Sequence, residues 1–183
     1  YGFFGTDAEG NKIDGYVIES DIDFSGVTLT MSDSFSGVIY GNYHTLSNLK
    51  LSLASKKVDK DTEKSLALFN ELSDTTIDNL TFENAAISIQ VDQGVTVKAA
   101  FLALNAKNVT LTNVKISGMT IDSGKGDTAG TRYTLGDLFV TASGTKLNDC
   151  DGEGLVANVS ETAVLRLTLL KLEAPEPTPT PAP

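Results

Sequence analysis

The sequence predicts an all-β protein, a single-domain parallel β-helix (β-solenoid) in which short strands stack from one coil to the next. The main evidence is a motif of alternating apolar residues around a central Asn, repeated at intervals of 31, 34 and 36 residues. Its copies are Leu46-x-Asn48-Leu49-x-Leu51, Ile77-x-Asn79-Leu80-x-Phe82, Leu111-x-Asn113-Val114-x-Ile116 and the weaker Leu147-x-Asp149-Cys150. A fixed period of this length is typical of repeat architectures. Residues 1–173 also contain no proline, as expected for hydrogen-bonded strands.

The centre of each motif is predicted to be a tight corner between two strands. Val109 and Leu111 alternate with period two, and Val114 and Ile116 do so again after a phase slip at Asn113. A strand that turns a corner and continues on a new face gives this pattern. An Asn side chain tolerates the left-handed backbone that such a corner needs. The sequence therefore predicts a structural ladder of polar residues stacked at one corner: Asn48, Asn79, Asn113 and Asp149.

A second apolar pair precedes each later motif and predicts a third strand in every coil. These pairs are Leu68-Phe69, Phe101-Leu102 and Leu138-Phe139. Stacked coils would pair each strand with its counterparts above and below, in parallel sheets around a dry core. We expect about four to five coils, right-handed by the general rule for parallel crossovers. Residues 61–72 also fit a helix with Asp61 as its N-cap, but the alignment of Leu68-Phe69 with its counterparts favours a strand.

The two ends of the predicted solenoid differ in composition. Eight of the 13 aromatic residues fall within the first 43 positions, which suggests an aromatic-rich N-terminal cap over the first coil. They are Tyr1, Phe3, Phe4, Tyr16, Phe24, Phe35, Tyr40 and Tyr43. Residues 164–172 alternate apolar and polar side chains, so this segment should close the last coil or pair with a neighbouring molecule. Residues 1–173 then form the β-helix domain, and residues 174–183, with all five prolines, form a Pro/Thr-rich linker or tail.

The composition argues against several classes of partner. The chain has 183 residues, a net charge of −10 and a pI of about 4.4. Nucleic acids and anionic membrane surfaces attract clustered cations, so neither is expected as a partner. No apolar run approaches 18 residues, and no membrane insertion is predicted. The single cysteine excludes an intrachain disulfide, and the start at Tyr1 reads as a mature or trimmed chain without a signal peptide.

Two segments of the first repeat resemble the GLUG-type repeat β-helix modules of bacterial surface and adhesin-like proteins. They are Tyr16-Val-Ile-Glu-Ser-Asp21-Ile22-Asp23-Phe24 and Phe35-Ser-Gly37-Val-Ile-Tyr40-Gly41-Asn42-Tyr43-His44-Thr45-Leu46-Ser-Asn48-Leu49, and the resemblance spans roughly residues 14–158. Tyr40 stands where those modules usually have Asp, and Tyr43 where they usually have Gly. The resemblance implies an exported module, secreted or attached to the cell surface, usually without catalytic activity of its own.

Three insertions are predicted to form a binding surface on one flank of the solenoid. Residues 53–65, 89–98 and 122–134 lengthen successive coils at the same point, so stacking should bring them together. Loops on a rigid scaffold commonly carry function, although variable solvated loops are the simpler interpretation. The candidate binding residues are Lys56, Lys57, Lys60, Lys98, Lys125, Arg132 and Tyr133, with Tyr133 as an aromatic ring that could stack on a sugar.

Few residues indicate metal or nucleophile chemistry. His44, the only histidine, and Cys150, in the inward slot of its motif, are both interpreted as structural. Asp149, Asp151 and Glu153 weakly resemble a calcium loop, but the distal bidentate glutamate is missing. We therefore predict no cofactor, and no metal site beyond this weak calcium candidate.

Three functional hypotheses follow. The first is a non-enzymatic, adhesin-like surface module that binds a glycan or a surface protein through the loop flank. The second is a structural subunit of an extracellular filament or layer that self-associates through the solenoid ends. The third is a carbohydrate-active enzyme, a polysaccharide lyase or hydrolase, which would need paired carboxylates or carboxylates beside a basic residue. Its candidate residues are Asp122, Asp127 and Asp137, with Lys125 and Arg132 nearby.

Overall fold

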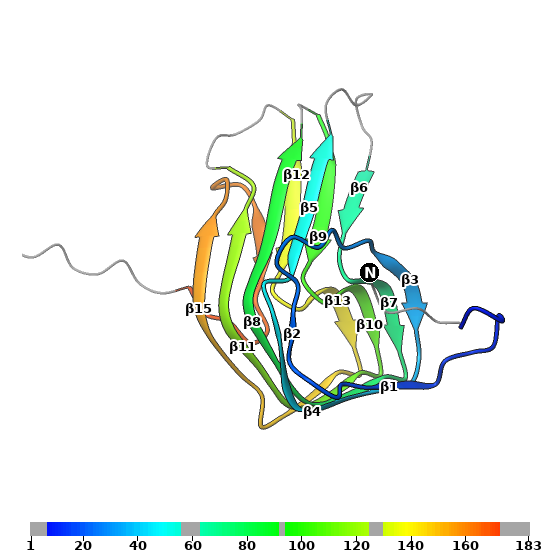
Figure 1. Cartoon of the computed structure of the whole chain (residues 1–183). Coiled ribbons are helices and arrows are strands. Elements are labelled where there is room, and N and C mark those ends of the chain that lie inside the picture. Colours follow the sequence, from blue (N-terminus) through cyan, green and yellow to red (C-terminus); the bar gives the residue numbers. More distant parts are fainter. Residues whose placement is uncertain (1–6, 56–62, 92–93, 125–129, 173–183) are drawn as a thin grey trace, which may run out of the picture.

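The computed structural model describes residues 7–55, 63–91, 94–124 and 130–172, and all regular secondary structure in these ranges is β-strand. The strands form three parallel sheets that wrap around one core (Figure 1). The predicted class, an all-β parallel β-solenoid, is confirmed.

One sheet has eight strands, and each of the other two has four. The long sheet contains β1 (Gly15–Val17), β2 (Ile22–Asp23), β4 (Val38–Ser47), β5 (Lys50–Ser55), β8 (Thr76–Val91), β11 (Thr110–Asp122), β14 (Lys146–Asn148) and β15 (Asp151–Asn158). The second sheet contains β3 (Ser32–Phe35), β7 (Phe69–Ser73), β10 (Ala103–Lys107) and β13 (Phe139–Ser143). The third sheet contains β6 (Glu63–Leu66), β9 (Thr96–Ala100), β12 (Arg132–Gly136) and β16 (Val164–Arg166).

Each complete coil passes from the long sheet to the third sheet and then to the second sheet. Three coils are complete, and they contain β4 to β7, β8 to β10 and β11 to β13. Within the described ranges, the first coil has no strand in the third sheet and the last coil has none in the second sheet. The solenoid therefore has three full turns rather than the predicted four to five, because both terminal coils are incomplete.

The segment that fitted either a helix or a strand is extended. β6 and β7 cover most of residues 63–73, and each pairs with a strand of the next coil. The helix alternative is therefore wrong for these residues. Tertiary pairing outweighs the local helical pattern because every strand in a coil must match its neighbour above or below.

The long sheet bends twice along each coil, at residues with a left-handed backbone. In β8 the bends lie at Asn79 (φ 51°) and Asn84 (φ 52°), and in β11 at Asn113 (φ 50°) and Gly118 (φ 77°). Asn and Gly adopt this conformation at low cost. Each bend shifts the alternation by one position, so apolar side chains on both sides of it face the core. The buried apolar residues of β8 are Ile77, Leu80, Phe82, Ala85, Ile87 and Ile89.

Three members of the predicted ladder stack at the first of these two corners. Asn79, Asn113 and Asp149 follow one another in register on successive coils, and all three have a positive φ. Nδ2 of Asn113 donates a 2.9 Å hydrogen bond to Oδ1 of Asn79. The amide side chains thus connect neighbouring coils at a point where the main-chain ladder is interrupted.

Asn48, the fourth predicted member, lies at the second corner instead. The strand register on either side places it opposite Asn84. Its Nδ2 donates a 2.8 Å hydrogen bond to Oδ1 of Asp23 on the preceding coil. In that first complete coil the first corner is built from Gly41–Tyr43, where the register shifts. The sequence placed Asn48 at the wrong corner because its counterpart on the next coil, Asn84, does not fit the motif. Ala85 follows Asn84 at the position where the motif has a large apolar residue.

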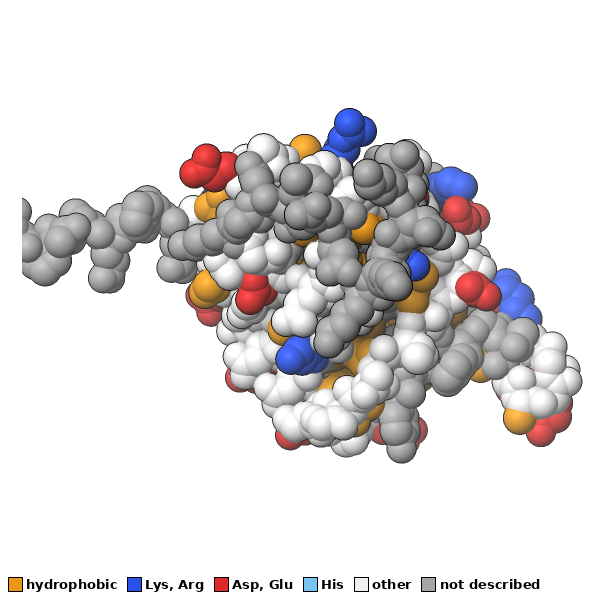
Figure 2. All heavy atoms as spheres, turned by 90° about the horizontal axis from the view of Figure 1, so that it is seen from above, with side chains coloured by type: hydrophobic (Ala, Val, Ile, Leu, Met, Phe, Trp, Pro, Cys, Tyr) orange, Lys and Arg blue, Asp and Glu red, His pale blue; other side chains and the backbone are white. Residues whose placement is uncertain are grey.

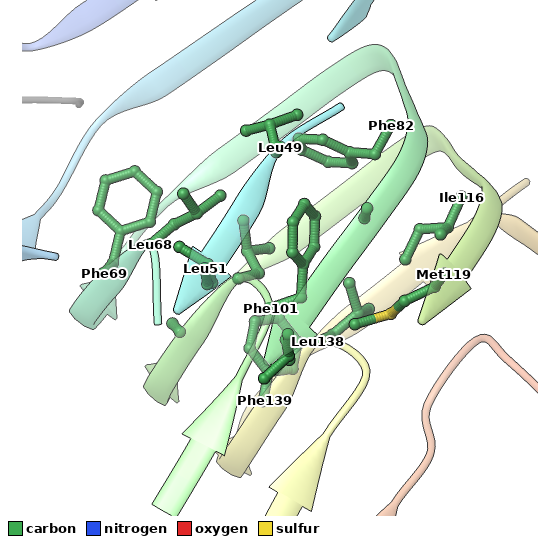
Figure 3. Close-up of a cluster of buried hydrophobic side chains, with 14 of the residues drawn as sticks. Leu49, Leu51, Leu68, Phe69, Phe82, Phe101, Ile116, Met119, Leu138 and Phe139 are labelled. Atoms are coloured by element: carbon green, nitrogen blue, oxygen red, sulfur yellow. The ribbon is translucent and has the colours of Figure 1, made fainter. Parts of the chain in front are cut away.

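Stacked apolar side chains from all three sheets fill the interior (Figure 3). Phe82 from β8 and Phe101 from the end of β9 meet edge to face, with ring centroids 5.1 Å apart and planes at 85°, a favoured aromatic geometry. Leu49, Ile116 and Leu138 are also almost completely buried. Burying one such side chain contributes roughly 1.5–3 kcal/mol. The repeated core explains how the chain can form a rigid scaffold with a single, unpaired cysteine.

Aromatic residues form only part of the predicted N-terminal cap. The rings of Tyr16 and Phe35 lie 5.7 Å apart, and those of Phe35 and Phe69 lie 6.0 Å apart, so this row leads into the core. Tyr40 and Tyr43 do not belong to the cap, because they project from the outside of β4 and are 49% and 77% exposed. Phe24 is partly buried against the core. The remaining predicted members, Tyr1, Phe3 and Phe4, lie outside the described residues.

Residues 167–172, which we call the C-terminal plug, close the other end. β16 pairs with β12, and the chain then packs Leu167 and Leu169 against the core and buries Leu170. The fully buried carboxylate of Asp137 accepts hydrogen bonds of 2.7–2.9 Å from the backbone N–H groups of Leu138, Thr168, Leu169 and Leu170. Residues 164–170 thus lie against the last coil and its core.

Candidate functional site

The described parts of the predicted insertions lie along one flank of the solenoid, where the long sheet gives way to the third sheet. β5, β8, β11 and β15 end at this flank, and β6, β9, β12 and β16 begin there (Figure 1). Ser55 pairs with Val91, and Asp122 pairs with both Ser88 and Asn158. The segments are less loop-like than the sequence predicted, because β8 continues to Val91 and β9 begins at Thr96.

The described cations of this flank do not form one basic patch. Nζ of Lys98 lies 2.8 Å from Oε2 of Glu63, so its charge is locally balanced. Arg132 is exposed at the start of β12. The view onto this end of the molecule shows the coloured Lys and Arg side chains apart from one another (Figure 2). Four further predicted binding residues, Lys56, Lys57, Lys60 and Lys125, lie outside the described residues.

Tyr133 does not present the exposed ring that the sequence predicted. It lies within β12 and is only 4% exposed, as part of the apolar core. The reason is the alternation of the strand, in which Arg132 faces out, Tyr133 faces in and Leu135 faces in again. Stacking of a sugar on the face of Tyr133 is therefore excluded, although the residue still borders a pocket.

A pocket of about 350 Å³ opens at this flank, between the ends of β8, β11 and β15. Its polar lining comes from Ser88, Gln90, Asp122, Ser123, Tyr133 and Asn158, and Ile89 and Val91 add apolar surface. Consecutive coils contribute matching positions, since Ser88, Asp122 and Asn158 are paired in register. We call this site the flank pocket.

The lining of the flank pocket contains a hydrogen-bonded pair of polar side chains. Nδ2 of Asn158 donates a 2.8 Å hydrogen bond to Oδ1 of Asp122, and the backbone N–H of Gly124 donates a 3.0 Å bond to the same oxygen. Oδ2 of Asp122 and Oδ1 of Asn158 have no hydrogen-bond partner in the described part of the chain. Both atoms are acceptors, so the pair can receive hydroxyl or amine donors from a ligand.

The wall of the flank pocket also contains an unsatisfied hydroxyl. Oγ of Ser123 is buried and has no hydrogen-bond partner among the described residues, an uncommon state for a buried polar atom in a folded protein. Its backbone is held to the next coil, since the N–H of Ser123 donates a 3.0 Å bond to the carbonyl of Asn158. The serine therefore forms part of the rigid wall beneath the Asp122–Asn158 pair.

Asp122 and Asp137, the two carboxylates of the enzyme hypothesis within the described residues, are not brought together. Asp122 lines the flank pocket, whereas Asp137 is fully buried beneath the C-terminal plug, with both oxygens occupied by backbone N–H groups. An acid–base pair needs both carboxylates within reach of one bond. Asp127 and Lys125 lie outside the described residues.

His44 and Cys150 have structural surroundings. Nδ1 of His44 lies 3.1 Å from Oδ1 of Asp21, which also accepts a 2.8 Å hydrogen bond from the backbone N–H of Thr45. Cys150 continues the inward row of Val114 and is partly buried against the core, and its thiol donates to the carbonyl of Leu111 at 3.4 Å. Neither side chain lines the flank pocket.

The weak calcium candidate gains no support from the geometry. Asp149 occupies a corner position with φ 51°, and Asp151 and Glu153 are exposed on β15. Oδ1 of Asp151 accepts the backbone N–H of its neighbour Gly152. In the part of the chain that the structure describes, no three acidic, His or Cys side chains are grouped as metal ligands.

Sequence reasoning did not single out Ser88, Gln90 and Asn158 as site residues. Their proximity depends on the register of three coils. One signal was present: Asp122 and Asn158 are separated by 36 residues, which matches the last repeat interval. Residues one period apart are neighbours in a solenoid.

Comparison with known proteins gives no further assignment: no model of a protein family, no curated protein and no solved structure matches the chain. The described residues contain no helix long and apolar enough to cross a membrane.

Proposed function

We propose that this chain is a non-enzymatic binding module whose flank pocket holds part of a glycan. The observation that carries the proposal is the Asp122–Asn158 pair, fixed by a 2.8 Å hydrogen bond in the lining of a cavity of about 350 Å³. The site stands on three stacked strands, so its geometry is set before a ligand arrives. Preorganisation of this kind lowers the entropic cost of binding.

The chemistry of the pocket suits a sugar. Ligand pockets typically measure about 300–1,000 Å³, so this cavity is near the lower limit and fits a small group such as one sugar unit. Two free acceptor oxygens, the amide of Gln90 and the hydroxyl of Ser88 can bond to ligand hydroxyls. Val91, which is partly buried, provides apolar surface for the carbon-bound face of a ring.

The negative charge of the pocket and of the whole chain limits the class of glycan that we expect to bind. Asp122 is the only residue with a charged side chain among the described residues of the pocket, and the chain carries a net charge of −10. A carboxylated or sulfated sugar would meet repulsion both locally and from the whole molecule. We therefore expect a neutral sugar or an amino sugar.

The resemblance to GLUG-type repeat modules supports a bacterial cell-surface or secreted location for this activity. A Pro/Thr-rich stretch at residues 174–183 is the kind of extended spacer that separates a binding module from a neighbouring element. The alternative of a filament subunit has less support, because the C-terminal plug covers the end of the core through which coils would have to stack.

A glycan array probed with the fluorescently labelled chain tests the proposal. We expect binding to neutral or amino-sugar glycans, reduced at least tenfold in affinity by Asn158→Ala, which removes an acceptor and frees Asp122. Asn105→Ala is the matched control, since Asn105 lies on the second sheet and also makes side-chain hydrogen bonds. Binding that Asn158→Ala leaves unchanged would place the ligand elsewhere, and an array without any hit would argue against a glycan ligand.

A further inference from the structure

A second exposed surface lies at the first corner of β4, away from the flank pocket. Here three residues, Gly41, Asn42 and Tyr43, stand opposite the single corner residue Asn79 of the next coil. Gly41 is needed because a Cβ atom at this position would overlap the carbonyl oxygen of Asn79. Asn42 and Tyr43 then both adopt a left-handed backbone, with φ of 51° and 65°.

The side chains around this bulge are large, apolar and exposed. Tyr43 is 77% exposed, Tyr40 is 49% exposed and Val17 is 60% exposed. Val17 and Tyr40 are directly paired across β1 and β4. We call these three residues the tyrosine patch. Exposed aromatic and apolar side chains on an outer face are characteristic of a contact surface, and Tyr is enriched in such surfaces.

Tyr43 has no structural role that explains its conformation. A left-handed backbone is rare for a bulky residue and costs free energy that glycine avoids. The exposed ring buries little surface in return. Other corners of the long sheet use Asn, Asp or Gly at the left-handed position. The ring is therefore held outward at a cost, which is understandable if it contacts something outside the chain.

Carboxylates lie near the tyrosine patch. Residues 13–49 contain five Asp or Glu residues, and the nearest cations in the sequence, Lys12 and Lys50, directly flank this segment. Tyr40 is paired with Val17 on the preceding coil and with Asp78 on the next coil. Asp21, on the preceding coil, lies beside His44. A Tyr ring attracts a cation to its face, and nearby carboxylates strengthen the attraction. Charge complementarity therefore selects a positively charged partner.

We propose that the tyrosine patch docks a basic segment of a protein partner, with Arg or Lys side chains lying over Tyr40 and Tyr43 and pairing with the surrounding carboxylates. Arg is favoured over Lys, because its planar guanidinium both stacks on aromatic rings and bonds to carboxylates in a bidentate manner. This contact is independent of the flank pocket, which lies at the opposite end of the long strands.

Fluorescence anisotropy with a labelled octa-arginine peptide tests the proposal on the full chain. We expect Tyr43→Gly and Tyr40→Ser each to weaken binding about tenfold. Neither substitution changes the net charge, so general attraction of a polycation to an acidic protein is unaffected. Tyr43→Gly should unfold at the same or a higher temperature than the wild type, which separates lost binding from lost folding. An octa-lysine peptide should bind more weakly than octa-arginine.

Matched controls make the outcome unambiguous. Val156→Thr removes an exposed apolar residue from β15, and Asn158→Ala alters the flank pocket, so both variants should bind octa-arginine like the wild type. Equal binding by Tyr43→Gly, Tyr40→Ser and the wild type would show attraction by net charge only and would overturn the proposal. If Tyr43→Gly and Tyr40→Ser lost binding to a neutral oligosaccharide but bound octa-arginine like the wild type, the proposal would also be overturned. The patch would then be assigned to a sugar.

Discussion

The carboxylate of Asp137 and the backbone of Leu170 join two distant parts of the chain: Oδ2 accepts a 2.8 Å hydrogen bond from the Leu170 N–H, and both groups are buried. The same carboxylate binds the N–H groups of Thr168 and Leu169. A carboxylate can accept several such bonds at once, which no neutral side chain of the same size can do. Asp137 therefore anchors the C-terminal plug over the core.

Asp137→Asn should destabilise the fold strongly. The amide NH₂ would face backbone donors and leave at least one buried N–H unpaired, and each unsatisfied buried group costs about 1–3 kcal/mol. We expect a loss of roughly 3 kcal/mol or more in the free energy of unfolding, measured by urea denaturation. Asp33→Asn, at an exposed position of β3, serves as the control. Equal denaturation midpoints for the two variants would contradict the anchoring role of Asp137.

Removal of residues 167–183 should open the C-terminal end of the solenoid. The truncated chain would expose the apolar residues that Leu170 covers and the unpaired edges of the last coil, and such edges recruit other chains. Light scattering should show association that increases with protein concentration, whereas the full chain should remain monomeric. Concentration-dependent assembly of the full chain would instead favour the filament hypothesis.

The corner residue Asn113 should tolerate glycine better than alanine. Alanine loses the 2.9 Å bond to Asn79 and also strains the left-handed backbone, at a combined cost of about 2–3 kcal/mol. Glycine loses the hydrogen bond but fits the backbone, so about 1 kcal/mol is expected. Urea denaturation of both variants measures the difference. Similar losses for alanine and glycine would show that the backbone conformation is not what the corner requires.

Acid should weaken the N-terminal coils through Asp21 and Asp23. The N–H of Thr45 and then His44 lower the pKa of Asp21, and the side chain of Asn48 and then Ser25 lower the pKa of Asp23. A carboxyl with a lowered folded-state pKa stabilises the fold above its ordinary value of 3.8, and this contribution is lost as the pH falls through the lower folded-state pKa.

An Asp21→Asn, Asp23→Asn double variant tests this pH dependence. Its melting temperature should fall less steeply than that of the wild type as the pH decreases below 3.8, because two groups no longer take up protons on unfolding. Both carboxylates are exposed, so the effect should also shrink at high salt. An equally steep fall of the melting temperature with pH in the variant and the wild type would show that Asp21 and Asp23 are not responsible for the acid sensitivity.

The repeat motif was sufficient to predict the fold, but it did not determine the register of every coil. Asn79 and Asn113 share both the motif and the corner, so period and structure agree there. Asn48 shares the motif but lies one corner further along, and its interval of 31 residues to Asn79 was the sign of a mismatch. Two corners with similar local sequence cannot be told apart until the strands are paired.

The candidate site was harder to predict than the fold. Asp122 was identified only as a candidate carboxylate of the enzyme hypothesis, and its partner Asn158 comes from the next coil. Tyr133 was assigned to a loop, although its spacing from Leu135 matched the inward phase of a strand. Sites assembled from several coils depend on long-range register, whereas strand alternation is a local property.

Mapping a bound sugar by NMR tests the central claim most directly. Backbone amide shifts of the ¹⁵N-labelled chain would be followed during titration with the best neutral or amino-sugar ligand from the glycan array. The flank pocket predicts saturable shifts at residues 88–91, 122–124 and 158, with the tyrosine patch unaffected. Shifts confined to other surfaces, or no shifts at high ligand concentration, would contradict the proposal that this solenoid binds glycans through its flank pocket.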